Sequence, residues 1–362
     1  MSIELWTLAI AVVTALVCAL CGSLLLVNRQ SMVSEGLSHA VLPGLVVAFL
    51  VFRDYNSPWL ILSAAASGMI MIWLTQWLQQ TRLVDSDAGL GIVFAGMFSL
   101  GILIVSRFLR NTHFHADCII DGNLALAPLD RFLWAGFDWG PRSWIIMLSL
   151  LLIVTTFVVV CFKELALTLF DPLLARRFQL RPRLLQFISL SIISLTTVAA
   201  FNVAGSVLIV ALMIAPPAAA YLLTNRLSML MLAACGLAAV SAVGGHFVAM
   251  SLDLSPTGPM ASVAGMLFLC VFLLAPRRGL LGQLRQWNQQ SSRLEEDLVL
   301  EIVSAAESCA LPELAASLNW SHRRLQKAIR GLQCSGLVLL NNNRICCAAS
   351  SATQPVPGQH AS

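Results

Sequence analysis

Long apolar runs, separated by short polar segments, make up most of this chain. A run of about 20 apolar residues is long enough to cross a bilayer as a helix. We predict nine spans, of which the second and sixth are short: about 5–27, 37–53, 58–78, 89–106, 143–162, 185–201, 205–223, 228–250 and 259–276. The expected fold is an all-α polytopic membrane protein with eight or nine transmembrane helices, because residues 201–205 can be a connection or only a kink.

The pattern changes to that of a small soluble domain after the last span. Apolar residues recur at helical spacing from Leu294, and two more short helices and a hairpin follow. Three helices followed by a hairpin are typical of a winged-helix α+β domain. The predicted parts are a transmembrane domain (1–282), a linker (283–291), a winged-helix-like cytoplasmic domain (292–346) and a disordered tail (347–362).

Composition and charge support the membrane assignment and set its orientation. The chain is 58% hydrophobic and 11% charged, with a mean hydropathy of +0.82, whereas soluble domains carry about 25% charged residues. Basic residues cluster in 163–185 and 277–293, which predicts that both segments are cytoplasmic. Counting spans back from them places the N-terminus outside, the stretch 107–142 outside and the C-terminus in the cytoplasm.

The outer stretch between the fourth and fifth spans is too polar to cross the membrane. Its segments Leu126–Leu129 and Phe132–Trp134 predict a short interfacial helix with aromatic anchors. His113 and His115, with Asp117, could collect metal at the outer mouth, and a solvated loop is the alternative interpretation.

The ten cysteines do not predict a disulfide framework. Five lie in apolar runs, where cysteine behaves as a small hydrophobic residue, and four lie in the tail that we place in the reducing cytosol. The Cys18-x-x-Cys21 pair is therefore read as packing in preference to a redox or metal motif. No cleavable signal peptide is expected, because the first apolar run lacks a basic region before it.

The segment from Ser34 to Gly44 carries the most distinctive chemistry. Glu35 and His39 lie four residues apart, on one face of a helix at the start of an apolar run. Ionisable groups are costly in lipid and usually line a polar path, and a carboxylate with an imidazole suits a divalent transition metal. The alternative is a helix start near the membrane surface, with a solvated Glu35 and a packed His39.

Three motifs occur in a fixed order along residues 5–282. The first is Gly22–Gly44, with Ser38-His39-Ala40-Val41-Leu42-Pro43-Gly44 at its end. The second is Lys163-Glu164-Leu165-Ala166 followed by Phe170-Asp171-Pro172, and the third is Gly205–Ala220, which includes Pro216-Pro217. Together they resemble the transmembrane permease family of metal-type ABC importers, which import manganese, zinc or iron.

The resemblance implies that the basic loop holds a coupling helix that docks into an ATPase subunit. Glu164 and Asp171 would offer carboxylates to that subunit and Phe170 an apolar plug, with an ordinary charged loop as the alternative. The chain has no Gly-x-x-x-x-Gly-Lys-Ser/Thr phosphate loop, so it is not expected to be an enzyme. A separate cytoplasmic ATP-binding subunit would supply the energy.

The resemblance also implies a metal path that includes Glu35, His39 and His246. No permanently bound cofactor is expected, and the transported ion would be Mn, Zn or Fe(II). The order of affinities of protein ligands for these metals does not distinguish among them. A core histidine is the alternative for His246, and packing or a hydrogen bond with Ser38 is the alternative for His39. Pro216-Pro217 would interrupt a helix, either beside the path or only for packing.

The same resemblance names the expected partners and location. One partner is a second permease, identical or paralogous, that would enclose a central path with this chain. The other is an extracytoplasmic metal-binding protein. The location is the lipid of a bacterial cytoplasmic (inner) membrane. An ion-gradient-driven secondary carrier is the alternative class, which the scarcity of intramembrane acids beyond Glu35 disfavours.

The C-terminal extension resembles the winged-helix part of metal-responsive transcription repressors. Arg323, Arg324 and Lys327 would lie on its third helix, where they could face a DNA groove or a protein partner. Because the domain is tethered to the membrane and has few basic residues, a docking or regulatory module is favoured over a nucleic-acid partner. A membrane-anchored regulator is the remaining alternative.

Overall fold

The computed structural model divides the chain into two compact units, unit 1 (Met1–Ala275) and unit 2 (Pro276–Ser362). The division falls close to the predicted end of the transmembrane domain at residue 282. The structure describes residues 3–28, 30–53, 58–81, 83–108, 122, 124–134, 137–170, 172–178, 182–275, 279–280, 282, 287, 294–295, 297–302, 308–310, 318, 325–326, 329–330, 332–333, 338–341 and 344–347.

Nine helices in the described part of the chain are long and apolar enough to cross a membrane, as the sequence predicts. The largest difference is at α2, which begins before the predicted residue 37 and so includes Glu35. The nine helices are α1 (Ile3–Val27), α2 (Val33–Phe52), α3 (Pro58–Gln80), α4 (Ser86–Phe108), α6 (Arg142–Val160), α9 (Pro182–Ala204), α10 (Ser206–Leu223), α11 (Leu227–Ser251) and α12 (Thr257–Leu274).

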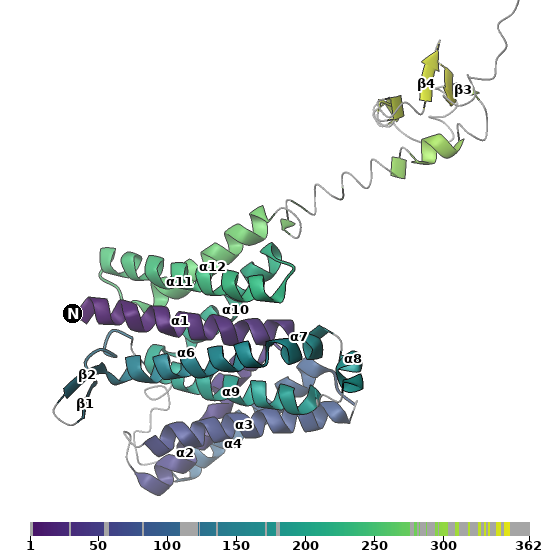
Figure 1. Ribbon diagram of the computed structural model, residues 1–362. Helices are drawn as coiled ribbons and strands as arrows, with labels where there is room; N and C mark the ends of the chain where they lie inside the picture. Colours follow the sequence, from purple (N-terminus) through teal and green to yellow (C-terminus); the bar gives the residue numbers. More distant parts are fainter. Residues whose placement is uncertain are drawn as a thin grey trace, which may run out of the picture. The chain divides into compact units, whose positions relative to one another are not determined.

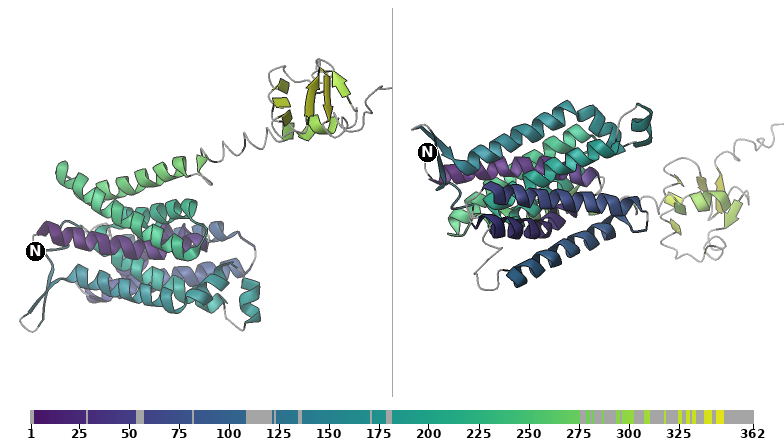
Figure 2. Two further views of the ribbon diagram at one scale, coloured as in Figure 1. Left: turned by 45° about the horizontal axis from the view of Figure 1, so that its top comes forward. Right: turned by 90° about the horizontal axis from the view of Figure 1, so that it is seen from below.

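Helix α1 is the central helix of unit 1 (Figure 1). It packs against α6, α9, α10 and α11, and α12 covers α10 and α11. Helices α2, α3 and α4 form a second group, which α9 joins to the rest through its contacts with α3 and α2. The helices lie side by side in the two further views as well (Figure 2). Fully buried side chains such as Ile10, Leu24 and Phe201 fill the core.

Helix α10 runs through Pro216 and Pro217 without a break, so the predicted interruption is not observed. Proline has no N–H, and Pro217 therefore leaves the carbonyl of Met213, four residues earlier, without its helical donor. Gly22 of α1 lies directly against this carbonyl, and a Cβ at that position would overlap it. Both prolines are buried within the bundle, and the carbonyl of Met213 lies at the close contact between α1 and α10.

The break between α9 and α10 lies at a single residue, Gly205, at the end of the stretch 201–205. Gly205 has a φ of 80°, a conformation that glycine adopts without a Cβ penalty. The Phe201 carbonyl at the break accepts hydrogen bonds from the N–H groups of Gly205 and Gly122. Gly122 belongs to the stretch between α4 and α6, where Leu124 is fully buried, so part of that stretch packs onto the α9–α10 break.

The interfacial helix predicted in this stretch is wrong for the described residues. Residues 124–129 form turns, and the aromatic segment that follows is the strand β1 (Arg131–Trp134), paired antiparallel with β2 (Phe137–Pro141). Trp134 is opposite Phe137 in the register of the two strands. The segment that suggested membrane anchoring is therefore one strand of a hairpin.

Two short helices follow α6 where the sequence predicts a coupling segment: α7 (Phe162–Phe170) and α8 (Pro172–Arg177). Helix α7 contacts both α6 and α8, and Leu165 on its inner face is buried. Unit 1 therefore carries a helical segment between the membrane helices α6 and α9.

Unit 2 contains three short strands, β3 (Ser308–Ala310), β4 (Val338–Asn341) and β5 (Arg344–Cys347), in an antiparallel sheet of order β3-β5-β4. Pairing of β4 with β5 confirms the predicted hairpin between 337 and 346. Strand β3 was not predicted, because three residues are too few for a periodic pattern to be visible. The predicted linker is described only at residue 287, and all of the predicted tail beyond Cys347 lies outside the described residues.

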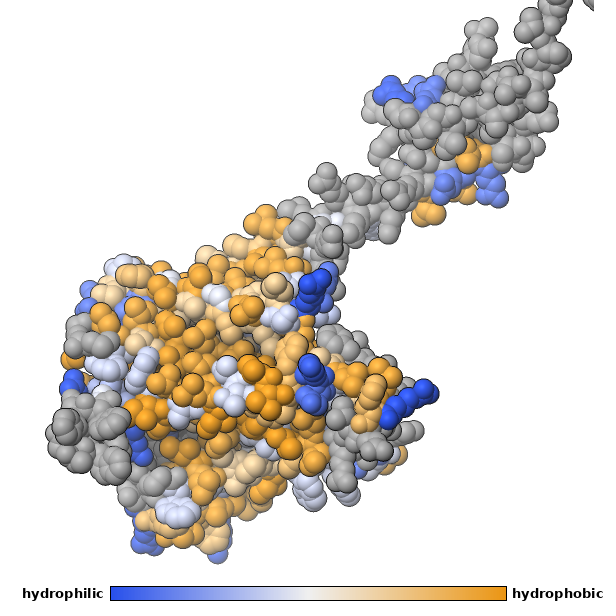
Figure 3. Space-filling view, viewed as in Figure 1, coloured by the Kyte–Doolittle hydropathy of each residue, from blue (hydrophilic) through white to orange (hydrophobic). Residues whose placement is uncertain are grey.

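Tryptophan side chains mark the two ends of the nine-helix bundle. Trp6 of α1 and Trp144 of α6 meet edge to face near the start of both helices, with 5.9 Å between ring centroids. Exposed Trp77 lies near the other end, in the last turns of α3. Tryptophan is enriched where headgroups meet hydrocarbon, so these rings indicate the two membrane surfaces. The surface between the ends is largely apolar (Figure 3).

Candidate functional site

The first turns of α2 carry the carboxylate and the imidazole that the sequence singled out. Glu35 is exposed on the surface of the single chain, and the Ser38 hydroxyl donates a 2.7 Å hydrogen bond to its backbone carbonyl. His39 lies one turn later on the same face and is half-buried. A single helical turn therefore presents a carboxylate and an imidazole together.

The ring of His39 lies against two aromatic side chains of α4. It stacks on Phe94 at 5.9 Å and meets Phe98 edge to face at 5.2 Å, measured between ring centroids. These contacts fix the orientation of the imidazole between α2 and α4. They support the packing role that the sequence left open, and they leave metal binding by its nitrogens untested.

The depth of this pair follows from its neighbours. Gly36, next to Glu35, lies against Met71 of α3 and Phe94 of α4. Both of these residues are more than two turns from the nearer end of their own helices, which is about 12 Å along the axis. Glu35 therefore lies beside the inner turns of α3 and α4. We infer that it is an ionisable group at membrane depth, where contact with lipid is costly.

His246 lies near the opposite end of the bundle. It is buried in α11, with 6% of its surface exposed, and its Nδ1 has no hydrogen-bond partner among the described residues. Gly245 beside it lies directly against the backbone of Met260 in α12, so the small residue allows the close approach that the sequence predicted. The pocket next to His246 is lined by Glu4 and Thr7, at the start of α1.

The structure does not bring Glu35 and His246 together within one chain. His246 neighbours the start of α1, whereas Glu35 follows shortly after the end of α1 at Val27. Helix α1, which runs between these two ends of the bundle, has 25 residues and is about 37 Å long. Among the described residues, no group of three or more His, Cys, Asp or Glu side chains could hold a metal ion together.

Glu164 is the described part of the predicted coupling site. It lies in the first turn of α7, is half-buried, and has an Oε2 atom that is buried without a hydrogen-bond partner among the described residues. Phe170 ends α7, but its side chain lies outside the described residues, and so does all of Asp171. The other predicted positions outside the described part of the chain are His113, His115, Asp117, Arg323, Arg324 and Lys327.

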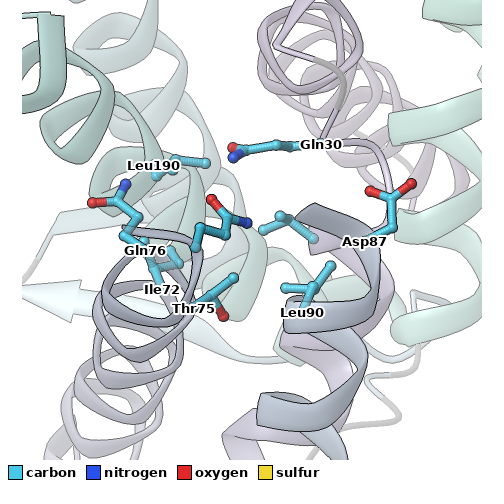
Figure 4. Close-up of a pocket in the computed structure, with 9 residues that line it drawn as sticks. Gln30, Ile72, Thr75, Gln76, Asp87, Leu90 and Leu190 are labelled. Carbon is cyan, nitrogen blue, oxygen red and sulfur yellow. The ribbon is translucent and has the colours of Figure 1, made fainter. Parts of the chain in front are cut away.

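A small polar pocket lies at the same end of the bundle as Glu35 (Figure 4). Gln30 from the α1–α2 connection, Gln76 from α3 and Asp87 from α4 line it. Oε1 of Gln30 and Nε2 of Gln76 are buried without partners among the described residues. The enclosed space of about 10 Å³ has room for one water and no larger solute. Sequence reasoning missed this pocket because its polar residues come from three separate segments.

The fold and the acid–histidine turn define a polytopic membrane protein with an ionisable site at membrane depth. The chain belongs to the ABC 3 transport family, whose sequence profile matches residues 2–275. That match spans unit 1 and all nine membrane-length helices.

Two relatives and one solved structure show the extent of the similarity. The manganese transport system membrane protein MntD of Bacillus subtilis (strain 168) is 35% identical over 81% of this chain and 99% of that protein. The zinc transport system membrane protein TroD of Treponema pallidum (strain Nichols) is 36% identical over 91% of each chain. The structure of PsaBC from Streptococcus pneumoniae in complex with Fab has the same fold, with a TM-score of 0.61, 24% identity, and coverage of 75% of this chain and 91% of that one.

The two relatives differ in how they match unit 2. MntD is matched over nearly its full length and leaves most of unit 2 without a counterpart. The similarity to TroD covers more of this chain than unit 1 contains, so it continues into unit 2. The extension is therefore shared with at least one relative.

Proposed function

We propose that this protein is the membrane permease subunit of an ATP-driven importer for divalent transition metal ions: manganese, zinc or iron. The printed names of the relatives, manganese for MntD and zinc for TroD, support this cargo class. Glu35 and His39 supply the carboxylate and imidazole that such metals accept as ligands. The observation that carries the proposal is their position at membrane depth on the exposed face of α2.

The exposed position of Glu35 supports a dimer of permeases. A carboxylate at this depth is costly against lipid and stable where it lines a water-filled path or a protein interface. A second permease, identical or paralogous, placed against this face would enclose a central path lined by Glu35 and His39. His246, at the other end of the bundle, would lie nearer the entrance of the path.

Radiolabelled uptake into proteoliposomes tests the proposal. ATP-dependent uptake of Mn²⁺, Zn²⁺ or Fe²⁺ is expected when the chain is reconstituted with its ATPase subunit, and no uptake is expected without it. Equal uptake in vesicles that lack any ATPase would overturn the proposal in favour of a carrier driven by an ion gradient.

The segment α7–α8 is the proposed docking site for the ATPase. Glu164 supports this role, because a buried carboxylate oxygen without a partner among the described residues can accept a hydrogen bond from a donor on another subunit. Phe170 and Asp171 would complete the contact with an apolar and an acidic side chain. This docking would pass the motion of the ATPase to α6 and α9, which flank the segment.

Glu164→Ala is expected to weaken ATPase binding roughly 30-fold. Truncating one partner of a buried, charge-assisted contact costs about 2 kcal/mol or more, which corresponds to that factor in Kd. Co-purification and titration of the ATPase on the solubilised permease measure the change. Lys163→Ala is the matched control, because Lys163 is the exposed neighbour on the same helix. ATPase affinity that is equal in the two variants would contradict the role of Glu164.

The basic segments support an orientation with the N-terminus outside and the C-terminus in the cytoplasm of a bacterial cell, in its cytoplasmic (inner) membrane. The end of the bundle that carries Trp6, the β1–β2 hairpin and His246 would then face outward. An extracytoplasmic metal-binding protein would dock there and release the ion.

Unit 2 is proposed to be a winged-helix-like docking or regulatory module. The β4–β5 hairpin agrees with the last element of this domain, and its three helices rest on the sequence pattern. The full-length permease is expected not to bind duplex DNA at low salt, where electrostatic binding is strongest. Binding of duplex DNA that disappears when Arg323 and Arg324 are changed to Ala would overturn the docking assignment.

A further inference from the structure

A second pocket, of about 280 Å³, opens at the end of the bundle where α1 begins. Glu4 and Thr7 line it from α1, and Ala125 from the stretch between α4 and α6. His246 in the last turns of α11 and Asp253 just after that helix complete its polar lining, and the remaining wall is apolar. The pocket thus joins one imidazole and two carboxylates from segments that are far apart in the sequence.

The imidazole is the buried part of this lining. His246 is 94% buried, with 6% of its surface exposed, and its Nδ1 lacks a hydrogen-bond partner among the described residues. Buried polar side-chain atoms normally have a partner, so this ring nitrogen calls for one that the described residues do not supply. Imidazole is a common ligand of divalent transition metals.

The two carboxylates stand at the mouth of the pocket. Glu4 and Asp253 are both exposed, and neither is joined by a hydrogen bond or ion pair to another described side chain. No basic residue is among the described residues that line the pocket. Glu4 and Asp253 lie at the level marked by Trp6, where water reaches the protein, so both carboxylates are solvated there.

The backbone holds Asp253 in place. The Leu254 N–H donates a 3.0 Å hydrogen bond to the carbonyl of Ala249, and Asp253 has a left-handed φ of 50°. This hydrogen bond and this backbone conformation terminate α11. Asparagine adopts this conformation as readily as aspartate does, so Asp253→Asn removes the charge and keeps the turn.

The lining of the pocket decides between a bare and a hydrated ion. No three ligating side chains in the described part of the chain could hold one ion together, so a bare ion would lack a protein shell. Glu4 and Asp253 are exposed to water at the mouth of the pocket, so an ion held there can keep its water. The pocket therefore suits a divalent cation that keeps most of its water.

We propose that this pocket is an extracytoplasmic binding site for a hydrated divalent metal cation, attracted by Glu4 and Asp253 and contacted by His246. The inference rests on the proposed function, which places this end of the bundle outside and makes such ions the cargo. The site lies within one chain, and it would hold an arriving ion before the ion reaches Glu35.

Mn²⁺ binding to the full-length chain in lipid nanodiscs tests the site, measured by loss of the electron paramagnetic resonance signal of free Mn²⁺. The double variant Glu35→Ala with His39→Ala serves as background, so that the membrane-depth pair cannot contribute. This background is expected to bind one Mn²⁺. Adding Glu4→Gln and Asp253→Asn is expected to weaken the Kd at least about tenfold, because two charges next to a divalent ion are removed.

Asp130→Asn is the matched control, because Asp130 is an exposed acid of the same outer stretch and does not line the pocket. It is expected to leave the Kd unchanged. A background that binds no Mn²⁺, or a pocket variant that binds as tightly as the background, overturns the inference. If either result were found while the wild type still showed ATP-driven uptake, the site would be wrong and the proposed function would remain. If the background bound Mn²⁺ at this pocket and the wild type showed no uptake, the proposed function would be wrong and the site would remain.

Discussion

Replacing Glu35 by alanine is expected to lower ATP-driven metal uptake at least about tenfold and to leave the fold intact. Glu35 is exposed on α2 and belongs to none of the apolar clusters, so truncation removes charge and little packing. Loss of an outer-shell partner of a metal costs about 10- to 100-fold in affinity, and loss of a ligand costs at least as much. The initial rate of Mn²⁺ uptake into proteoliposomes measures the effect.

The control for this variant is Asp85→Ala. Asp85 is another exposed acid, placed just before α4 and outside the predicted metal path, and its replacement is expected to keep the wild-type rate. Glu35→Asp retains the charge and withdraws the oxygen by one methylene, so an intermediate rate is expected. Wild-type uptake by Glu35→Ala would remove the metal-path assignment.

His39→Phe separates the two roles of the imidazole. Phenylalanine can keep the contacts with Phe94 and Phe98 while it removes both ring nitrogens. A ligand role predicts a well-folded variant with uptake as low as that of Glu35→Ala. A folded His39→Phe variant with the wild-type rate would assign His39 to packing alone.

Gly22→Ala is expected to prevent correct folding of unit 1. The added Cβ would overlap the backbone carbonyl of Met213, and a backbone group cannot move aside as the end of a side chain can. Overpacking at a helix contact costs about 1–3 kcal/mol or more, which is a large part of the total stability of a typical protein. Yield after detergent extraction, size-exclusion profile and thermal unfolding measure the result.

Gly236→Ala is the matched control, because Gly236 is also inside a membrane-length helix and a Cβ there meets nothing within 4 Å. Alanine is the better helix former, so this variant is expected to be as stable as the wild type or slightly more stable. A normally folded Gly22→Ala variant would contradict the close packing of α1 on α10.

The membrane helices were predictable because their signal is local. Twenty apolar residues must form a helix in lipid, where every backbone N–H and C=O needs an internal partner. The predicted and observed spans therefore agree closely, with the largest difference at the start of α2. The hairpin β1–β2 and strand β3 were missed, because strand formation depends on the partner strand as much as on the segment itself.

The site residues were visible in the sequence, but their grouping was not. Glu35 and His39 share a face because four residues make about one helical turn, which spacing alone predicts. The relation of His246 to them depended on which ends of α1, α2 and α11 lie together. Tertiary packing placed His246 beside Glu4 and Asp253 instead, a grouping that no spacing in the chain indicates.

The sequence by itself determined the approximate positions of the spans, the acid–histidine turn and the family motifs, because hydropathy and helical periodicity act over neighbouring residues. Only the tertiary structure decided that α10 continues through Pro216-Pro217, that Glu35 is exposed beside the inner turns of α3 and α4, and that His246 lies at the opposite end of the bundle. Those three facts depend on contacts between helices, which are set by the fit of whole side-chain surfaces and leave no local pattern along the chain.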